Sequence, residues 1–206
     1  GINFFDTAPN YAEGRSEEVL GKALKGKRDN VVINSKFGHL PGDQTDYSVE
    51  GLTESLEQSL RRLKTDWIDS IIIHNPPFEL LNGKNSHWEA LEKYKKEGKI
   101  RAYGASVDTT AEVEEVVKTT NSEIIELMFN LIYQKTRDAF TILKKNKYAC
   151  IVKVPLDSGW LTGKYDRDSV FSGVRSRWTR DQIRQRSEYV HGLEELVPEN
   201  STLISE

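Results

Sequence analysis

The chain has 206 residues, with 29 basic and 32 acidic side chains and a single cysteine. This length allows one domain with a substantial core and excludes two large domains. The formal net charge of -3 argues against nucleic acid as a general partner, because such binding needs a basic surface. One cysteine cannot form an internal disulfide, so we expect a reducing, cytoplasmic compartment. No apolar run approaches the roughly 20 residues of a membrane span, so no membrane partner is expected.

Six short apolar segments follow one another along the chain. They cover residues 2–8, 31–37, 67–74, 100–107, 124–132 and 149–155. Continuous apolar segments between polar stretches are typical of strands that are buried on both faces of a sheet. We therefore expect six strands.

Helical patterns lie between these segments. The clearest follows Ser48, where apolar residues recur at steps of three and four up to position 63. Ser16 can cap an earlier helix, and Gly26 can end it. A further helix is expected over residues 136–147. Sequences of the capping-box type begin at Ser86, Thr109 and Thr179.

Strict alternation of strands and helices predicts a parallel sheet with right-handed crossovers. A doubly wound sheet and an eight-stranded barrel both fit this order. The doubly wound nucleotide folds usually have a glycine-rich first turn, but the chain contains no G-x-G-x-x-G sequence. Near Gly21 and Gly26 the spacing approaches a phosphate-binding loop, but Arg28 stands where Ser or Thr should hold magnesium. We interpret those glycines as part of a helix end, and the barrel is favoured although two strands are missing.

Ionisable residues stand at the carboxyl ends of the first three expected strands. Asp6, Lys36 and His74 each end an otherwise apolar run, about one βα unit apart. In a parallel barrel such residues meet at one rim. Tyr11 follows shortly after Asp6. Each residue alone is usually a helix cap, a lysine with a buried stem or a core histidine, but the combination predicts a site.

This set of residues suggests proton transfer to a carbonyl. A buried lysine is costly unless it is paired, so Lys36 should pair with Asp6. The ammonium group should lower the pKa of Tyr11, because it favours the phenolate. His74 can donate a hydrogen bond to a carbonyl oxygen, which would receive a proton during reduction. A lyase or isomerase that uses Lys36 as a Schiff base is an alternative, although it would not need Tyr11.

The same residues belong to longer motifs. These are FDTAPNY at 5–11, GRSEEVLG at 14–21, SK at 35–36, DSIIIH at 69–74, GKIRAYGAS at 98–106 and LTGKY at 161–165. With them the chain resembles the aldo-keto reductase family, over most of its length up to about residue 165. The resemblance implies an α/β fold of the (β/α)8 TIM-barrel type and the reduction of an aldehyde or ketone with NADPH.

The resemblance also implies a role for each residue at the rim. Tyr11 would be the general acid, and Lys36 would lower its pKa. Asp6 would pair with Lys36, while His74 would orient the carbonyl of a small substrate. Hydride would pass from the nicotinamide to the carbonyl carbon. The alternative function within the same fold is a cofactor-binding regulatory or partner subunit with little turnover.

Further positions match the cofactor site of the family. Ser106 corresponds to a residue near the nicotinamide amide, and Leu156 and Ser158 correspond to the segment beside the pyrophosphate. Three positions depart from the family pattern: Val107 replaces a frequent Asn, Glu126 a Gln that contacts the amide, and Lys153 an aromatic residue that stacks on the ring. We hypothesise that Glu126 and Lys153 form an ion pair under the nicotinamide. No His or Cys spacing is typical of a metal site, so no metal is expected.

Trp160 and Trp178 stand on either side of the only long irregular segment. They fit an aromatic wall for the substrate and an ordinary packing role equally well. A complete barrel takes about 250 residues, and the motifs place the six strands as strands 2 to 7. We therefore expect residues 1–206 to be one barrel domain that is incomplete at both ends. Such an open arc has two exposed edges and should fold poorly by itself.

Overall fold

The computed structural model describes residues 1–194, and the rest of the expected domain, residues 195–206, lies outside the described residues. The chain divides into two units, which we describe separately. The first unit contains residues 1–127 and 135–151, and the second contains residues 128–134 and the chain from 152 onward. Within the described residues, no helix is both long and apolar enough to cross a membrane.

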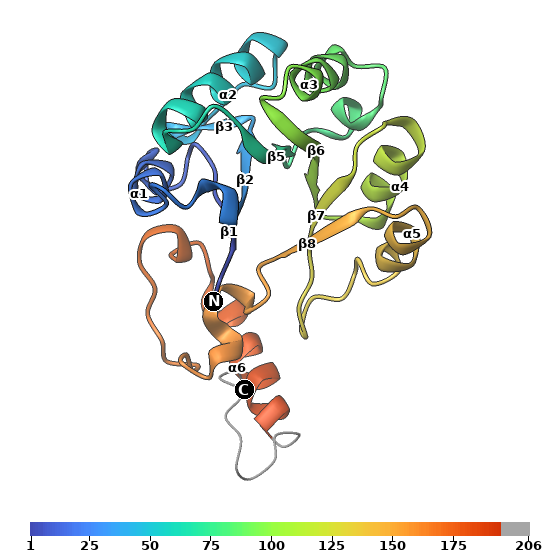
Figure 1. Ribbon diagram of the computed structural model, residues 1–206. Helices are drawn as coiled ribbons and strands as arrows, with labels where there is room; N and C mark the ends of the chain where they lie inside the picture. The colour runs from blue at the N-terminus through green and yellow to red at the C-terminus, as the bar shows by residue number, and fades with distance from the viewer. Residues whose placement is uncertain (195–206) are drawn as a thin grey trace. The chain divides into compact units, whose positions relative to one another are not determined.

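Six parallel strands form the main sheet, in the order β1-β2-β5-β6-β7-β8. Their bounds are Phe4–Asp6 (β1), Val32–Phe37 (β2), Ile68–His74 (β5), Ile100–Val107 (β6), Ile124–Met128 (β7) and Ala149–Lys153 (β8). The sheet curls, with helices on its outer side (Figure 1). This arrangement is part of a (β/α)8 barrel, which confirms the predicted fold class and the six predicted strands.

The central strands β2, β5, β6 and β7 are mostly buried on both faces, as their continuous apolar sequences predict, whereas the edge strands β1 and β8 are largely exposed. In β5 the successive side chains of Ile71, Ile72 and Ile73 are each at most 1% exposed. Neighbouring side chains of a strand point to opposite faces, so helices must cover one face and inward-pointing side chains the other. The apolar middles of the strands form the core, and the polar residues at the strand ends lie at its margin.

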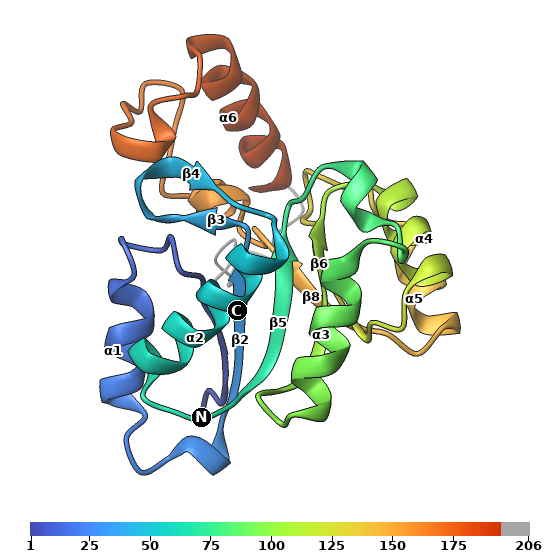
Figure 2. The same cartoon turned by 90° about the horizontal axis from the view of Figure 1, so that it is seen from above.

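Five helices belong to the first unit and carry the labels α1 to α5 in Figure 2. They are α1 (Arg15–Ala23), α2 (Val49–Leu63), α3 (Ser86–Lys96), α4 (Thr110–Thr119) and α5 (Ala139–Lys145). Ser48 is the N-cap of α2, and the capping box predicted at Thr109 is confirmed. Ser48 accepts a hydrogen bond from the backbone N–H of Gly51, and Thr109 forms a complete capping box with Glu112.

Two other predicted caps are wrong. Gly14 caps α1, and the hydroxyl of Ser16 instead lies 2.8 Å from that of Thr7. Asn85 is the N-cap of α3, so Ser86 is already inside the helix. In both cases the serine occurs one or two positions into the first turn. The capping-box sequence alone does not distinguish these positions.

The glycines near the start of the chain lie in α1 and in the turn after it and do not form a phosphate-binding loop, which agrees with their interpretation as part of a helix end. Gly21 lies inside α1, and a Cβ there would be only 2.5 Å from the backbone oxygen of Arg62 at the end of α2. Gly26 follows the helix with a φ of 76°. Glycine is needed at Gly21 because the backbones of α1 and α2 approach so closely.

An antiparallel hairpin follows β2 and was not predicted. It consists of β3 (His39–Leu40) and β4 (Gln44–Thr45), which pair with each other and not with the main sheet. Strands of two residues have no readable alternation of apolar and polar side chains. The hairpin places His39 close to the end of β5, as described below.

The second unit has its own small core beside helix α6 (Arg180–Glu194). Trp160 is fully buried against Ile183 and Val190. The ring of the partly buried Trp178 lies 5.8 Å from that of Trp160. The structure therefore favours a packing role for these two tryptophans over an aromatic wall for the substrate. The capping box predicted at Thr179 is present, with both hydrogen bonds between this residue and Gln182.

Candidate active site

Lys36 is the centre of a charged cluster at the carboxyl ends of the strands. Its side chain, from β2, is completely buried. The ammonium lies 2.6 Å from each carboxylate oxygen of Asp6 and donates to the backbone oxygen of Thr7 at 3.1 Å. The structure thus pairs Lys36 with Asp6, as the sequence predicts, and these contacts replace the water that the ammonium loses on burial.

Asp6 is held from the other side by a chain of polar side chains. The amide of Asn34 donates to Asp6 Oδ1 at 2.7 Å, and the hydroxyl of Ser70 donates to Asn34 Oδ1 at 2.5 Å. Register explains this contact, because Asp6 pairs with Asn34 and Asn34 with Ser70 across three neighbouring strands. The orientation of the carboxylate is therefore fixed by the sheet.

Glu126 is a second acid beside the lysine, and the sequence did not predict this contact. Its carboxylate, from β7, is 2% exposed and lies 3.4 Å from the ammonium of Lys36. Burial by itself would lower the pKa of Lys36, but the negative charges of Glu126 and Asp6 outweigh it and raise the pKa above its usual value. Lys36 therefore carries its positive charge at neutral pH.

Tyr11 lies beside this cluster, with the centre of its ring 5.1 Å from the ammonium of Lys36. Its pKa differs from the prediction. Burial raises the pKa of Tyr11, and the opposing effect of Lys36 does not cancel it, so the pKa lies above its ordinary value of 10.0. The sequence correctly identifies the direction in which Lys36 acts but not the stronger effect of burial. The phenol consequently holds its proton at neutral pH.

His74 ends β5 and also lies beside Tyr11. The two rings meet edge to face, with their centres 6.1 Å apart. The structure therefore brings all four predicted catalytic side chains, Asp6, Tyr11, Lys36 and His74, to one region. Sequence reasoning missed His39, whose ring is 4.6 Å from that of His74. No periodic signal marks His39, because it lies in the short hairpin.

Three polar side chains next to this region match the chemistry of a nicotinamide carboxamide. The hydroxyl of Ser106 lies 2.8 Å from both Asn75 Oδ1 and Glu126 Oε1, and Ser106 is fully buried. A carboxamide offers N–H donors and a carbonyl acceptor. Glu126 can accept from the donors, while Asn75 and Ser106 can donate to the carbonyl. The side chains of Ser106 and Glu126 thus fit this part of the cofactor, as the resemblance implies. Asn75 was not among the predicted cofactor residues.

The other predicted cofactor residues, Lys153, Leu156 and Ser158, lie in the second unit. Ser158 and the adjacent Gly159 have φ values of 59° and 101°. Consecutive residues with unusual backbone angles can turn several N–H groups toward an anion, which is compatible with a pyrophosphate. The predicted ion pair between Glu126 and Lys153 joins residues of different units and stays a prediction.

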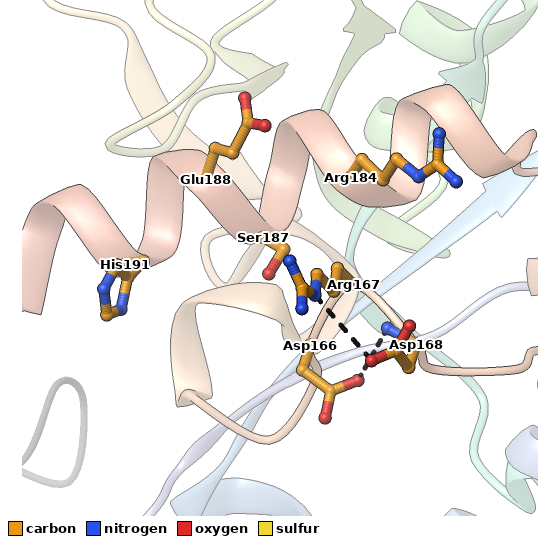
Figure 3. Close-up of a pocket in the computed structure, with 7 residues that line it drawn as sticks. All are labelled: Asp166, Arg167, Asp168, Arg184, Ser187, Glu188 and His191. Atoms are coloured by element: carbon orange, nitrogen blue, oxygen red, sulfur yellow. Dashed lines mark hydrogen bonds and ion pairs between the residues drawn. The ribbon is translucent and has the colours of Figure 1, made fainter.

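A cavity of about 750 Å³ in the second unit lies between residues 166–168 and helix α6 (Figure 3). Its lining alternates in charge, with Asp166, Arg167 and Asp168 on the loop and Arg184 and Glu188 on the helix. None of the predicted catalytic residues lines it. Among residues 1–194, no cluster of three or more His, Cys, Asp or Glu side chains could hold a metal ion.

Comparison with known proteins gives oxidoreductases and also proteins described as probable voltage-gated potassium channel subunits beta, one of them from Oryza sativa at 27% identity over 82% of this chain. An uncharacterized oxidoreductase of Bacillus subtilis, YqkF, is 32% identical over 169 residues, which is 80% of this chain and 55% of that protein. The NADH-specific methylglyoxal reductase of Escherichia coli is 31% identical over 216 residues, 96% of this chain and 66% of that protein. The chain thus spans a little over half to two thirds of the length of these relatives.

Solved structures agree. The holo form of the aldo-keto reductase AKR11C1 from Bacillus halodurans superposes with a TM-score of 0.80 at 27% identity, covering 98% of this chain and 66% of that one. The model of the aldo/keto reductase family matches residues 1–206. The chain belongs to the aldo-keto reductase family.

Proposed function

We propose that this protein reduces a small aldehyde or ketone to the alcohol, with NADPH as hydride donor and Tyr11 as general acid. The observation that carries the proposal is the fully buried ammonium of Lys36, which Asp6 holds beside the phenol of Tyr11. A lysine in this position is expensive to bury and is explained by a reaction that needs a charge there. The single cysteine supports a cytoplasmic location.

Tyr11 supplies the proton in this reaction. Its pKa is raised by burial, so the phenol is protonated and available at neutral pH. As negative charge develops on the carbonyl oxygen, the proton moves from the phenol to that oxygen. The ammonium of Lys36 then stabilises the phenolate that remains. A second proton from solvent restores the phenol after each turnover.

His74 and the carboxylates prepare this step. The imidazole of His74, next to the Tyr11 ring, can hydrogen-bond to the substrate carbonyl and hold it toward the phenol. Asp6 and Glu126 keep Lys36 charged. Neither carboxylate gives up or accepts a proton in this step.

Ser106, Asn75 and Glu126 would hold the nicotinamide carboxamide, and Leu156 and Ser158 would lie beside the pyrophosphate. When bound, the cofactor supplies the hydride that reaches the carbonyl carbon. The Escherichia coli relative is described as NADH-specific, so the preference for NADPH must be measured against NADH.

The test is oxidation of NADPH or NADH in the presence of a panel of aliphatic and aromatic aldehydes and ketones. Absorbance of the reduced cofactor reports the rate, and Tyr11→Phe is the comparison. We expect the unmodified chain to oxidise NADPH with at least one class of carbonyl compound. The rate of NADPH oxidation should be lower by a factor of about 10²–10⁴ in Tyr11→Phe.

Other outcomes separate the alternatives. Tight NADPH binding without oxidation by any carbonyl would contradict the reductase proposal and favour a cofactor-binding regulatory subunit. Turnover that survives Tyr11→Phe unchanged would show that another group donates the proton. Faster turnover with NADH than with NADPH would reverse the cofactor preference.

A further inference from the structure

The end of β5, which carries His74 and Asn75, is held by a hydrogen-bonded pair from the hairpin region. The phenol oxygen of Tyr47 lies 2.9 Å from the backbone oxygen of His74 and 3.1 Å from that of Asn75. Backbone oxygens only accept hydrogen bonds, so the single proton of the phenol is directed to them. The third contact of the phenol, 3.0 Å to His39 Nε2, must then be one that it accepts. His39 therefore carries a proton on Nε2.

The backbone around this contact has an unusual conformation. Asn75 has a φ of 47°, a left-handed value that costs energy in residues other than glycine. The ring of Tyr47 packs directly on Gly38, where a Cβ would collide with it. The Tyr47 ring therefore fits only because residue 38 has no side chain. Its hydroxyl hydrogen-bonds to the two backbone carbonyls where β5 ends.

His39 adds a contact to the side chain of His74. The two imidazole rings lie 4.6 Å apart and are tilted by 54°. His74 is therefore held both at its backbone, by Tyr47, and at its ring, by His39. The next residue, Asn75, accepts a hydrogen bond from Ser106 at 2.8 Å. The hydrogen bond from Tyr47 to the Asn75 backbone therefore also holds the side chains that would bind the carboxamide.

We propose that Tyr47 and His39 are positioning residues, which hold the His74 imidazole and the Asn75 amide in the geometry that the substrate carbonyl and the nicotinamide require. Neither residue donates a proton in the reaction. The effect on turnover rests on the proposed carbonyl reduction, whereas the effect on the His74 ring does not depend on it.

The first experiment measures the His74 ring by NMR in the chain without cofactor or substrate. The chain has four histidines, so the ring signals can be assigned with single variants. Tyr47→Phe keeps the aromatic ring on Gly38 and removes only the hydroxyl. Tyr94→Phe is the matched control, because its hydroxyl bonds Thr53 at 2.7 Å on the outer helices. We expect the His74 signals to shift in Tyr47→Phe and not in Tyr94→Phe.

The second experiment measures kcat and KM for the best carbonyl of the panel. A displacement of catalytic groups by about 1 Å can cost about a hundredfold in rate, so we expect kcat to fall about tenfold to a hundredfold in Tyr47→Phe. His39→Leu should lower kcat similarly. His39→Gln should recover most of the loss, because its amide N–H can still donate to Tyr47. Tyr94→Phe should stay within about twofold of the unmodified chain.

The outcomes separate this inference from the proposed function. If the unmodified chain turns over no carbonyl but the His74 signals shift in Tyr47→Phe, the positioning role stands and the reductase proposal fails. If turnover is normal and Tyr47→Phe changes neither the His74 signals nor kcat, the positioning role is overturned. A fall in kcat without any change at the His74 ring would also contradict it.

Discussion

Lys36 in the first unit and Trp160 in the second are both completely buried, but their surroundings differ. Lys36 is surrounded by Asp6, Glu126 and a backbone oxygen, whereas Trp160 is surrounded by Ile183, Val190 and aromatic rings. Burying the tryptophan stabilises the fold directly. Burying an ion pair is at best neutral for stability. The contrast assigns Trp160 to the packing of the fold, and it agrees with the proposed role of Lys36 in catalysis.

The largest effect on stability is expected at Trp160. Trp160→Ala should destabilise the second unit by about 3–5 kcal/mol, because it removes the centre of the aromatic cluster and leaves a cavity. Hydrogen exchange of the α6 amides measures the loss. Trp160→Phe, which keeps an aromatic ring, should lose less than half as much. Equal losses in the two variants would contradict a packing role.

Lys36→Met should destabilise the first unit by about 3 kcal/mol, because the carboxylates of Asp6 and Glu126 lose their shared ammonium. The double variant Lys36→Met with Glu126→Gln should be more stable than Lys36→Met alone by about 1 kcal/mol or more, since one buried negative charge is then removed. Urea unfolding of the single and double variants tests this. A double variant less stable than both single variants would show that charge pairing does not govern this region.

A smaller loss of stability is expected from changes in the outer helices, away from Lys36 and Trp160. Thr109→Ala should cost about 1 kcal/mol of unfolding free energy, because it removes the capping box of α4. Ser86→Ala is the control. Although its sequence also predicts a cap, Ser86 lies inside α3 and its loss should cost less than about 0.5 kcal/mol. Similar costs at both positions would contradict the assigned caps.

The most conservative substitution is Glu126→Gln, which keeps the shape of the side chain and removes its charge. The negative charge of Glu126 contributes to the raised pKa values of Tyr11 and Lys36. In the proposed mechanism the protonated phenol is the acid, so the rate should fall where pH exceeds the pKa of Tyr11. Glu126→Gln lowers that pKa, and the alkaline limb of the pH–rate profile should move to lower pH. A limb that moves to higher pH would contradict the assignment of Tyr11.

Much of the fold and part of the site could be predicted from the sequence. The six strands were recognisable because their sequences are continuously apolar. Burial of both faces explains this pattern in β2, β5, β6 and β7, whereas β1 and β8 are edge strands that are largely exposed. Asp6, Lys36 and His74 could be brought together because parallel strands end at the same rim. The structure adds the reason for the orientation of Asp6, which is the register between Asp6, Asn34 and Ser70.

The rest depended on information that a linear pattern does not contain. The hairpin with His39 is too short for a periodic signal. The pKa of Tyr11 depends on how deeply the ring is buried, which sequence does not report. Glu126 was assigned to the cofactor by resemblance, but its contact with Lys36 follows from the curl of the sheet, which brings β7 and β2 together around the lysine.

The most direct test of the account is the titration of Tyr11, followed by NMR with tyrosine labelled at the ring carbon that bears the hydroxyl. Tyr11→Phe identifies the signal among the eight tyrosines. Because the charge of Lys36 opposes the effect of burial, we expect Lys36→Met to raise the pKa of Tyr11 above its value in the unmodified chain. An unchanged or lower pKa in Lys36→Met would show that the lysine does not stabilise the phenolate, and would contradict the proposed catalytic role of the pair.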